Sequence, residues 1–86
     1  MPPEVLIYAA GWCAYCARAR ALLERKAVAF RELDTDDADL RAEMIQRSGR
    51  RSVPQIFIGP RHVGGFEELY ALERSGELDT LLKETP

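Results

Sequence analysis

The sequence predicts an α/β domain, because apolar strand-like runs alternate along it with amphipathic helical patterns. A continuous apolar run at residues 5–8 is typical of a strand covered on both faces. Apolar residues at helical spacing follow it at 14–26, and the only two cysteines lie where this helix begins. The chain has 86 residues, of which 47% are hydrophobic and 30% charged, enough for one core but not two. We therefore expect residues 1–86 to form a single domain.

The first half of the chain is predicted to form a βαβ unit. The helix at 14–26 places four small or apolar residues inward, which are Cys16, Ala19, Leu23 and Ala27. The second strand is predicted at 28–33, parallel to the first, with a right-handed crossover. Asp36 or Asp37 then caps a helix that ends at Gly49. The inward residues of this second helix are Leu40, Met44 and Ile45.

The second half is predicted to contain a hairpin and two short helices. The hairpin strands are expected at 55–58 and 62–64, joined by a Gly-Pro-Arg turn. Gly65 opens a helix that carries Leu69 and Leu72 inward and is broken at Gly76. A last helix at 77–83 turns its three leucines toward the core. The predicted element order is β-α-β-α-β-β-α-α.

Charge and the N-terminus exclude several classes of function. The formal net charge is −2 and the pI about 5.4, so the chain lacks the basic surface that binds nucleic acid. The N-terminal residues have no basic region, and the apolar run behind them is too short for a signal peptide or a membrane span. We expect a cytoplasmic monomer that binds neither nucleic acid nor membranes.

The segment Cys13-Ala14-Tyr15-Cys16 predicts redox chemistry. A pair this close cannot close a loop long enough to stabilise the fold much, so reactivity explains it better. Cys13 precedes the first helical turn, where unpaired N–H groups and the helix dipole stabilise a thiolate, so we predict that it is the nucleophile. Cys16 lies one turn further on the same face and can resolve a mixed disulfide by attacking the Cys13 sulfur.

Metal binding is a weaker interpretation of the cysteine pair. A structural zinc site needs four ligands, whereas this chain offers two cysteines and one histidine, so only metal shared between two copies stays open. His62 is interpreted as an ordinary strand residue. Arg20, one turn beyond Cys16, either adds positive charge near the pair or projects to solvent.

Four segments together resemble the bacterial dithiol glutaredoxins, over about residues 5–82. They are Tyr8, Cys13-Ala14-Tyr15-Cys16, Ser52-Val53-Pro54-Gln55-Ile56-Phe57-Ile58 and Gly64-Gly65-Phe66-Glu67-Glu68-Leu69. The resemblance implies a thioredoxin-like fold, with a four-stranded mixed sheet and helices on both faces. It also implies that glutathione is the reductant, and that the partners are disulfide-containing or glutathionylated proteins.

The resemblance implies a glutathione site as well. The Val53-Pro54 bond is expected to be cis, with the backbone of Val53 pairing with the cysteine of glutathione. The γ-glutamyl end is expected at Gly65 and Phe66, with Glu67 meeting its ammonium group, and Tyr15 and Ser52 beside the tripeptide. The residues alone favour a trans proline and an ordinary glycine turn; the resemblance reverses both.

Three residues near the cysteines depart from the family pattern. Ala10 stands where many glutaredoxins have a lysine, and Arg50 and Arg51 are candidates to replace its charge. Trp12 is reminiscent of thioredoxins, although the glutathione segments argue against a thioredoxin reduced by a flavoenzyme. Ala14 replaces a common proline, which loosens the turn.

This last departure supports an alternative function. Some relatives without that proline hold a [2Fe–2S] cluster between two subunits, ligated by the nucleophilic cysteine and glutathione. In that alternative Cys13 is the metal ligand, and the protein is an iron–sulfur carrier or sensor.

Overall fold

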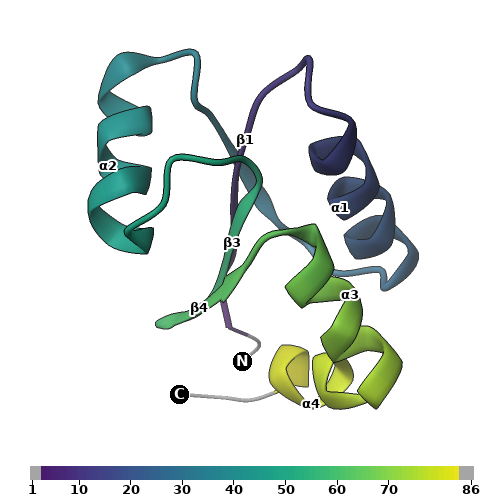
Figure 1. Ribbon diagram of the computed structural model, residues 1–86. Helices are drawn as coiled ribbons and strands as arrows, with labels where there is room; N and C mark the ends of the chain where they lie inside the picture. The colour runs from purple at the N-terminus through teal and green to yellow at the C-terminus, as the bar shows by residue number, and fades with distance from the viewer. Residues whose placement is uncertain (1–2, 84–86) are drawn as a thin grey trace.

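The computed structural model describes residues 3–83, which form a four-stranded sheet with helices on both faces (Figure 1). The elements follow the predicted order: β1 (Val5–Ala9), α1 (Ala14–Arg25), β2 (Arg31–Asp34), α2 (Ala38–Ser48), β3 (Gln55–Ile58), β4 (Arg61–Gly64), α3 (Phe66–Ser75) and α4 (Glu77–Lys83). The fold is thioredoxin-like, as the resemblance implied. Within residues 3–83, no helix has the length and apolar character that crossing a membrane requires.

The sheet has the strand order β2-β1-β3-β4. β1 and β2 are parallel, as predicted, while β3 is antiparallel to both β1 and β4. Tyr8 at the end of β1 pairs with Gln55 at the start of β3. The loop that leaves β1 and the loop that enters β3 therefore meet at one end of the sheet, and the two cysteines follow the first of these loops.

Side chains of the central strands alternate between two apolar layers, because successive strand residues point to opposite faces. One layer packs against α1, α3 and α4 and is contributed by Val5, Ile7, Ala9, Ile56 and Ile58. The other layer contains Tyr8 and Phe57 and packs against Met44 of α2. In Figure 1, α2 accordingly lies on one side of the sheet and α1 and α3 on the other.

A polar cluster fixes α2 to its face of the sheet. The fully buried Tyr8 donates its hydroxyl hydrogen to Glu43 and accepts a hydrogen bond from Arg47 Nη1 at 2.9 Å. Burial is the main reason that the pKa of Tyr8 is raised. Because a buried hydroxyl is costly without partners, these two contacts let Tyr8 occupy the core while it positions α2.

The second strand was predicted wrongly at 28–33. The chain is irregular through Phe30, and β2 begins only at Arg31. Val28 and Phe30 still pack against the α1 layer without joining a strand. As the edge of the sheet, β2 exposes most of its side chains and so lacks the apolar run that marks β1.

The first helix also ends differently from the prediction. It stops at Arg25 with Lys26 as its C-cap, and Ala27 follows in a left-handed conformation with φ 56°. Ala27 is therefore exposed rather than inward, and Leu22 takes the buried place.

The other predicted boundaries are close to those observed. Asp37 caps α2 by accepting hydrogen bonds from two backbone N–H groups, and Gly49 ends that helix in the left-handed region. β1 extends one residue further, to Ala9, and β4 begins one residue earlier, at Arg61.

Candidate functional site

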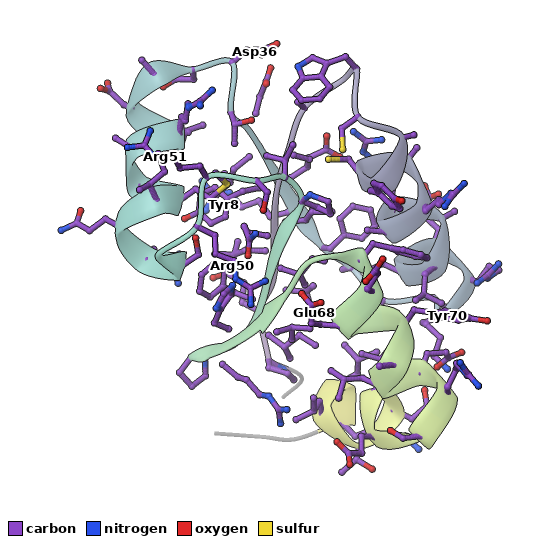
Figure 2. The ribbon with its side chains drawn as sticks, viewed as in Figure 1. Tyr8, Asp36, Arg50, Arg51, Glu68 and Tyr70 are labelled. Atoms are coloured by element: carbon purple, nitrogen blue, oxygen red, sulfur yellow. The ribbon has the colours of Figure 1, made fainter. Side chains whose placement is uncertain are left out.

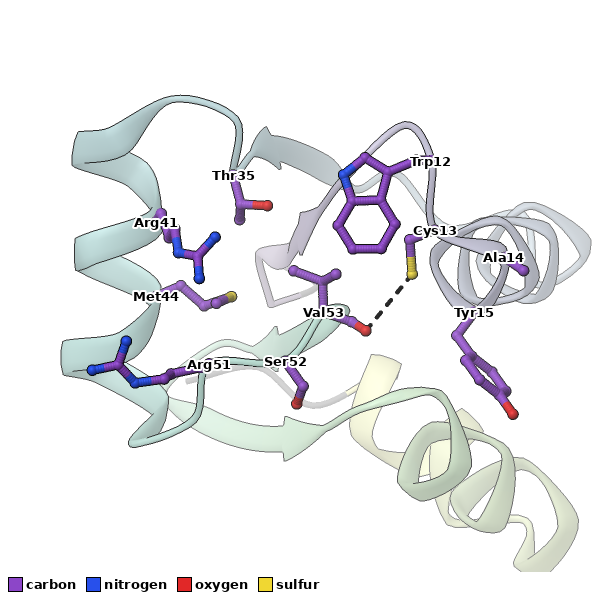
Figure 3. A pocket seen from close by; sticks show the side chains of 10 residues that line it. All are labelled: Trp12, Cys13, Ala14, Tyr15, Thr35, Arg41, Met44, Arg51, Ser52 and Val53. Carbon is purple, nitrogen blue, oxygen red and sulfur yellow. Dashed lines mark hydrogen bonds between the residues drawn. The ribbon is translucent and has the colours of Figure 1, made fainter.

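Cys13 and Val53 meet where the two loops at the end of the sheet converge. The Cys13 thiol donates to the carbonyl oxygen of Val53, with 3.7 Å between sulfur and oxygen (Figure 3). The Val53-Pro54 peptide bond is cis, as the resemblance implied. The nucleophile predicted from the sequence and the predicted contact for a substrate backbone therefore lie side by side.

Cys13 is the N-cap of α1. Its sulfur accepts a hydrogen bond from the backbone N–H of Cys16 at 3.1 Å, in the place where a serine or aspartate oxygen often caps a helix. Its own N–H donates to the carbonyl oxygen of Ala10 at 3.2 Å. Cys13 is 7% exposed as a residue and lines a pocket, through which an incoming disulfide can reach its sulfur. This geometry suits a sulfur that becomes negatively charged.

Cys16 has the opposite environment. It is fully buried on the inner face of α1, and burial, followed by its hydrogen bond with Cys13, raises its pKa to about 12. Both cysteines are free thiols in this structure. Reduced Cys16 therefore keeps its proton at neutral pH, and Cys13 is the sulfur available for the first attack.

The structure decides the question left open about Arg20. Its guanidinium donates to Glu32 at 2.6 Å and to the carbonyl oxygen of Ala10 at 3.4 Å, behind the cysteines. Arg20 therefore braces the loop that carries Cys13 rather than projecting freely to solvent. Its pKa is raised, mainly by Glu32.

A groove of about 270 Å³ runs from Val53 to the start of α3; we call it the α3-side groove. It contains all seven residues predicted to contact glutathione, which are Tyr15, Ser52, Val53, Pro54, Gly65, Phe66 and Glu67. The rings of Tyr15 and Phe66 face each other with centroids 6.3 Å apart, and form an aromatic wall. Tyr15 is half exposed. The structure thus brings the predicted residues into one concave surface.

Glu68 holds the α3 end of this groove in place. Its carboxylate accepts hydrogen bonds from the N–H of Gly65 at 2.7 Å and from Arg50 Nη1 at 3.1 Å (Figure 2). The N–H of Gly65 is the main reason that the pKa of Glu68 is lowered. A Cβ on Gly64 would lie 2.5 Å from this carboxylate, at a φ of +119°, so glycine is required there.

Sequence reasoning missed the polar contacts beneath the loop at Ser52. Gln55 is 1% exposed and donates its side-chain N–H groups to the Ser52 carbonyl oxygen at 3.0 Å and hydroxyl oxygen at 3.2 Å. Its oxygen lies 2.7 Å from Nε2 of His62, so His62 carries its proton there. His62 is therefore more than a plain strand residue. A polar residue opening an apolar strand was the available indication, since a buried amide needs partners.

A second pocket, of about 380 Å³, lies on the other side of Cys13; we call it the α2-side pocket (Figure 3). It is lined by Trp12, Cys13, Ala14, Tyr15, Thr35, Arg41, Met44, Arg51, Ser52 and Val53. Trp12 is 77% exposed. Arg41 contributes a positive charge that the sequence alone did not point to, because it lies on α2, far from the cysteines along the chain.

Metal ligands do not gather in the described part of the chain. Among residues 3–83, no three histidine, cysteine or acidic side chains are placed to hold one ion. His62 faces Gln55 instead of the cysteines.

The cysteine pair lies at the start of α1, beside the loop with the cis proline. This arrangement defines a thiol–disulfide redox protein of the thioredoxin-like class. The glutaredoxin family model matches residues 5–63. A glutaredoxin from Pseudomonas aeruginosa is 54% identical over 83 residues, covering 95% of this chain and 98% of the relative. This chain belongs to the glutaredoxin family.

Solved structures agree with the sequence relatives. The solution structure of glutaredoxin from Brucella melitensis superposes with a TM-score of 0.84 at 57% identity, covering 95% of this chain and 90% of that one. A buckwheat glutaredoxin–glutathione complex superposes with a TM-score of 0.85 at 26% identity, covering 93% of this chain and 76% of that one. The general kind of activity is therefore thiol–disulfide oxidoreduction.

Proposed function

We propose that this protein is a glutathione-dependent oxidoreductase that reduces protein disulfides and protein–glutathione mixed disulfides. One observation carries the proposal: Cys13, at the N-cap of α1, lies against Val53 at the head of a groove that is shaped by all seven predicted glutathione contacts. The proposed setting is the reducing cytoplasm, where glutathione is abundant. Residues 1–86 act as one domain and one subunit in this proposal.

The α3-side groove supports a definite pose for glutathione. The cysteine residue pairs with the backbone of Val53, which places its sulfur at Cys13. The γ-glutamyl carboxylate accepts a hydrogen bond from the N–H of Phe66 at the positive end of α3, beside the N–H of Gly65 that donates to Glu68. Glu67 is exposed at the groove and receives the ammonium group. The related buckwheat protein was solved with glutathione bound, which supports this use of the fold.

The glycyl carboxylate then points toward the α2-side pocket. There Arg51 supplies the positive charge that a lysine provides in many glutaredoxins, at the position where this chain has Ala10. Of the two candidates, Arg50 already pairs with Glu68 at 3.1 Å. Arg51 lines the pocket that contains Cys13, together with Arg41. Both guanidinium groups suit a carboxylate ligand.

Reduction of a protein disulfide takes two exchanges. The Cys13 thiolate attacks one sulfur of the client disulfide, which breaks that bond and releases the other client sulfur as a thiolate that takes up a proton. Cys16 then loses its proton and attacks the Cys13 sulfur, which releases the second client thiol. Two glutathione molecules reduce the resulting Cys13–Cys16 disulfide and become one glutathione disulfide.

A glutathionylated client needs only Cys13. Its thiolate attacks the glutathione sulfur, the client leaves as a thiol, and a second glutathione attacks the sulfur of glutathione on Cys13 to form glutathione disulfide. Because Cys16 forms no bond in this sequence, the two activities separate by mutation.

The test is a coupled assay with glutathione and its reductase, run on wild type, Cys13→Ser and Cys16→Ser. We expect Cys13→Ser to lose both activities, and Cys16→Ser to lose protein-disulfide reduction but keep removal of glutathione. Full deglutathionylation by Cys13→Ser would overturn the assignment. Turnover with thioredoxin reductase but not with glutathione would overturn the choice of reductant.

A second candidate function is binding of a [2Fe–2S] cluster between two subunits. Cys16 is fully buried, so each subunit offers one accessible thiol, Cys13, and glutathione would supply the remaining thiolates. The donor set of two subunits with two glutathiones fits such a cluster, which would supply iron–sulfur chemistry. Anaerobic reconstitution tests it: a monomer on sizing, without visible charge-transfer absorption, would remove this candidate.

A further inference from the structure

The α2-side pocket offers more than one small carboxylate requires. Besides Arg41 and Arg51 it presents the indole of Trp12, which Figure 3 shows beside Cys13 and facing Thr35 and Val53. Among residues 3–83, Trp12 is the most exposed of the large hydrophobic residues, at 77%. An exposed tryptophan next to a reactive sulfur provides a flat apolar platform for a bound chain.

The charges of this pocket are available to a ligand. Among residues 3–83, neither Arg41 nor Arg51 makes a salt bridge, whereas Arg20, Lys26 and Arg50 each pair with a carboxylate. In a chain whose formal charge is −2, these two guanidinium groups form a local positive site on the α2 side of the pocket, across from Cys13 (Figure 3). Such a site attracts an anionic group.

The proposed pose of glutathione sets the direction of a bound polypeptide. Its γ-glutamyl side lies at α3 and its glycyl side at the α2-side pocket, with its cysteine on Val53. A client chain that pairs with Val53 in the same way directs the residue after its half-cystine into the α2-side pocket. Trp12 then packs over that residue.

We propose that the α2-side pocket selects protein disulfides in which an acidic residue directly follows the attacked cysteine. Arg41 and Arg51 bind the acidic side chain, and Trp12 packs against the client backbone. This inference rests on the proposed function, since it uses attack by Cys13 and pairing of the client with Val53. The partner is thus an extended segment of a client protein that carries a cysteine–aspartate or cysteine–glutamate pair.

The exchange can be followed without glutathione. Blocked tetrapeptides of the form alanine–cysteine–X–alanine, joined as symmetrical disulfides, react with the reduced enzyme in one turnover. One peptide disulfide is reduced to two peptide thiols, while Cys13 and Cys16 are oxidised to a disulfide. Trp12 is the only tryptophan and adjoins Cys13, so its fluorescence reports the reaction in stopped flow.

We expect the second-order rate constant to be about fivefold higher with aspartate at X than with asparagine, which corresponds to about 0.95 kcal/mol. Moving the aspartate to the position before the cysteine removes the preference. Higher salt reduces it, because the pocket is open to solvent.

Arg41→Gln and Arg51→Gln should each lower the aspartate-to-asparagine ratio, and the double variant should bring it close to one. Arg61→Gln is the matched control, because Arg61 is exposed at the opposite end of the sheet, and it should keep the ratio. The proposal would be overturned by equal rates for the aspartate and asparagine peptides, or by the same preference for aspartate on either side of the cysteine. It would also be overturned by an aspartate-to-asparagine ratio that is unchanged in the double variant, or by no reaction with any peptide. Loss of glutathione-coupled turnover alone would instead count against the proposed function.

Discussion

The two hollows beside Cys13 differ in how far their polar groups are already engaged. In the α3-side groove, Glu68 is bonded to Gly65 and Arg50, and Gln55 is bonded to Ser52 and His62. In the α2-side pocket, Arg41 and Arg51 pair with no carboxylate among residues 3–83, and Trp12 is exposed.

This difference assigns different tasks to the two sides. A preorganised surface binds one fixed ligand well, because little ordering is needed when the ligand arrives. A charged surface whose groups have no partner yet tolerates varied ligands and selects them by charge. We therefore associate the α3-side groove with the constant γ-glutamyl end of glutathione, and the α2-side pocket with whatever follows the reacting cysteine.

The largest difference between the two sides is expected from glycine substitutions. Gly64→Ala places a Cβ 2.5 Å from the Glu68 carboxylate at a φ of +119°, whereas a Cβ on Gly11 meets nothing within 4 Å. We expect Gly64→Ala to lose about 1–3 kcal/mol of unfolding free energy and to raise the KM for glutathionylated substrate. Gly11→Ala should stay within about 0.5 kcal/mol. Urea unfolding and kinetics on both variants check this, and equal losses would contradict the comparison.

Removal of the amide beneath Ser52 should have the next largest effect. Gln55→Leu leaves the Ser52 carbonyl and His62 without their partner, so we expect a loss of about 1–2 kcal/mol in unfolding free energy. If Gln55 positions Val53, the KM for glutathionylated substrate rises while kcat is kept. Gln46→Leu, on the exposed face of α2, is the control. A fall in kcat with unchanged KM would show that Gln55 does not act through substrate binding.

Substitution of Glu68 should have a smaller effect on the free energy of unfolding, and this effect should depend on pH. Its pKa is lowered from the ordinary 4.5, so its contribution to stability is complete above that pH and is lost as the pH falls through the folded-state value. We expect Glu68→Ala to cost about 0.5–1 kcal/mol at pH 7, because the carboxylate is half exposed. Unfolding of both proteins from pH 7 down to acid should show the difference shrinking below 4.5. Glu24→Ala, on the exposed face of α1, should show no such trend.

The smallest effect is expected in the α2-side pocket. Arg51→Gln removes one of two cationic groups, so we expect about a threefold rise in the KM for glutathionylated substrate, and the rise should be weaker at high salt. Arg61→Gln controls for net charge. A larger rise with Arg50→Gln than with Arg51→Gln would reverse the assignment of the glycyl carboxylate.

Much of the fold could be predicted because its central elements have strong local patterns. The strands β1 and β3 are apolar on both faces, and Asp37 and Gly49 mark the ends of α2 with capping chemistry that is visible in the sequence. The start of β2 was predicted three residues too early, because the apolar Val28 and Phe30 precede it and its own side chains are mostly exposed. An edge strand is defined by its pairing with β1, which no local pattern contains.

The site likewise has residues that the sequence indicated and contacts that it did not. The cysteine pair and the seven groove residues lie in segments that resemble a known family, and the structure brings the seven into one groove. The contact between Gln55 and His62 depends on the hairpin between β3 and β4. The presence of Arg41 and Cys13 in one pocket depends on the packing of α2 against the sheet. Such contacts arise from tertiary structure, so sequence spacing alone did not indicate them.

The most direct test of the account is a map of glutathione on the protein. The Cys16→Ser variant should hold one glutathione on Cys13 as a stable mixed disulfide, and amide spectra with and without it can be compared by nuclear magnetic resonance. We predict large shifts at Val53, Gly65 and Phe66, with Arg61 unchanged. Shifts confined to residues 10–16, with Gly65 and Phe66 unmoved, would contradict binding in the α3-side groove.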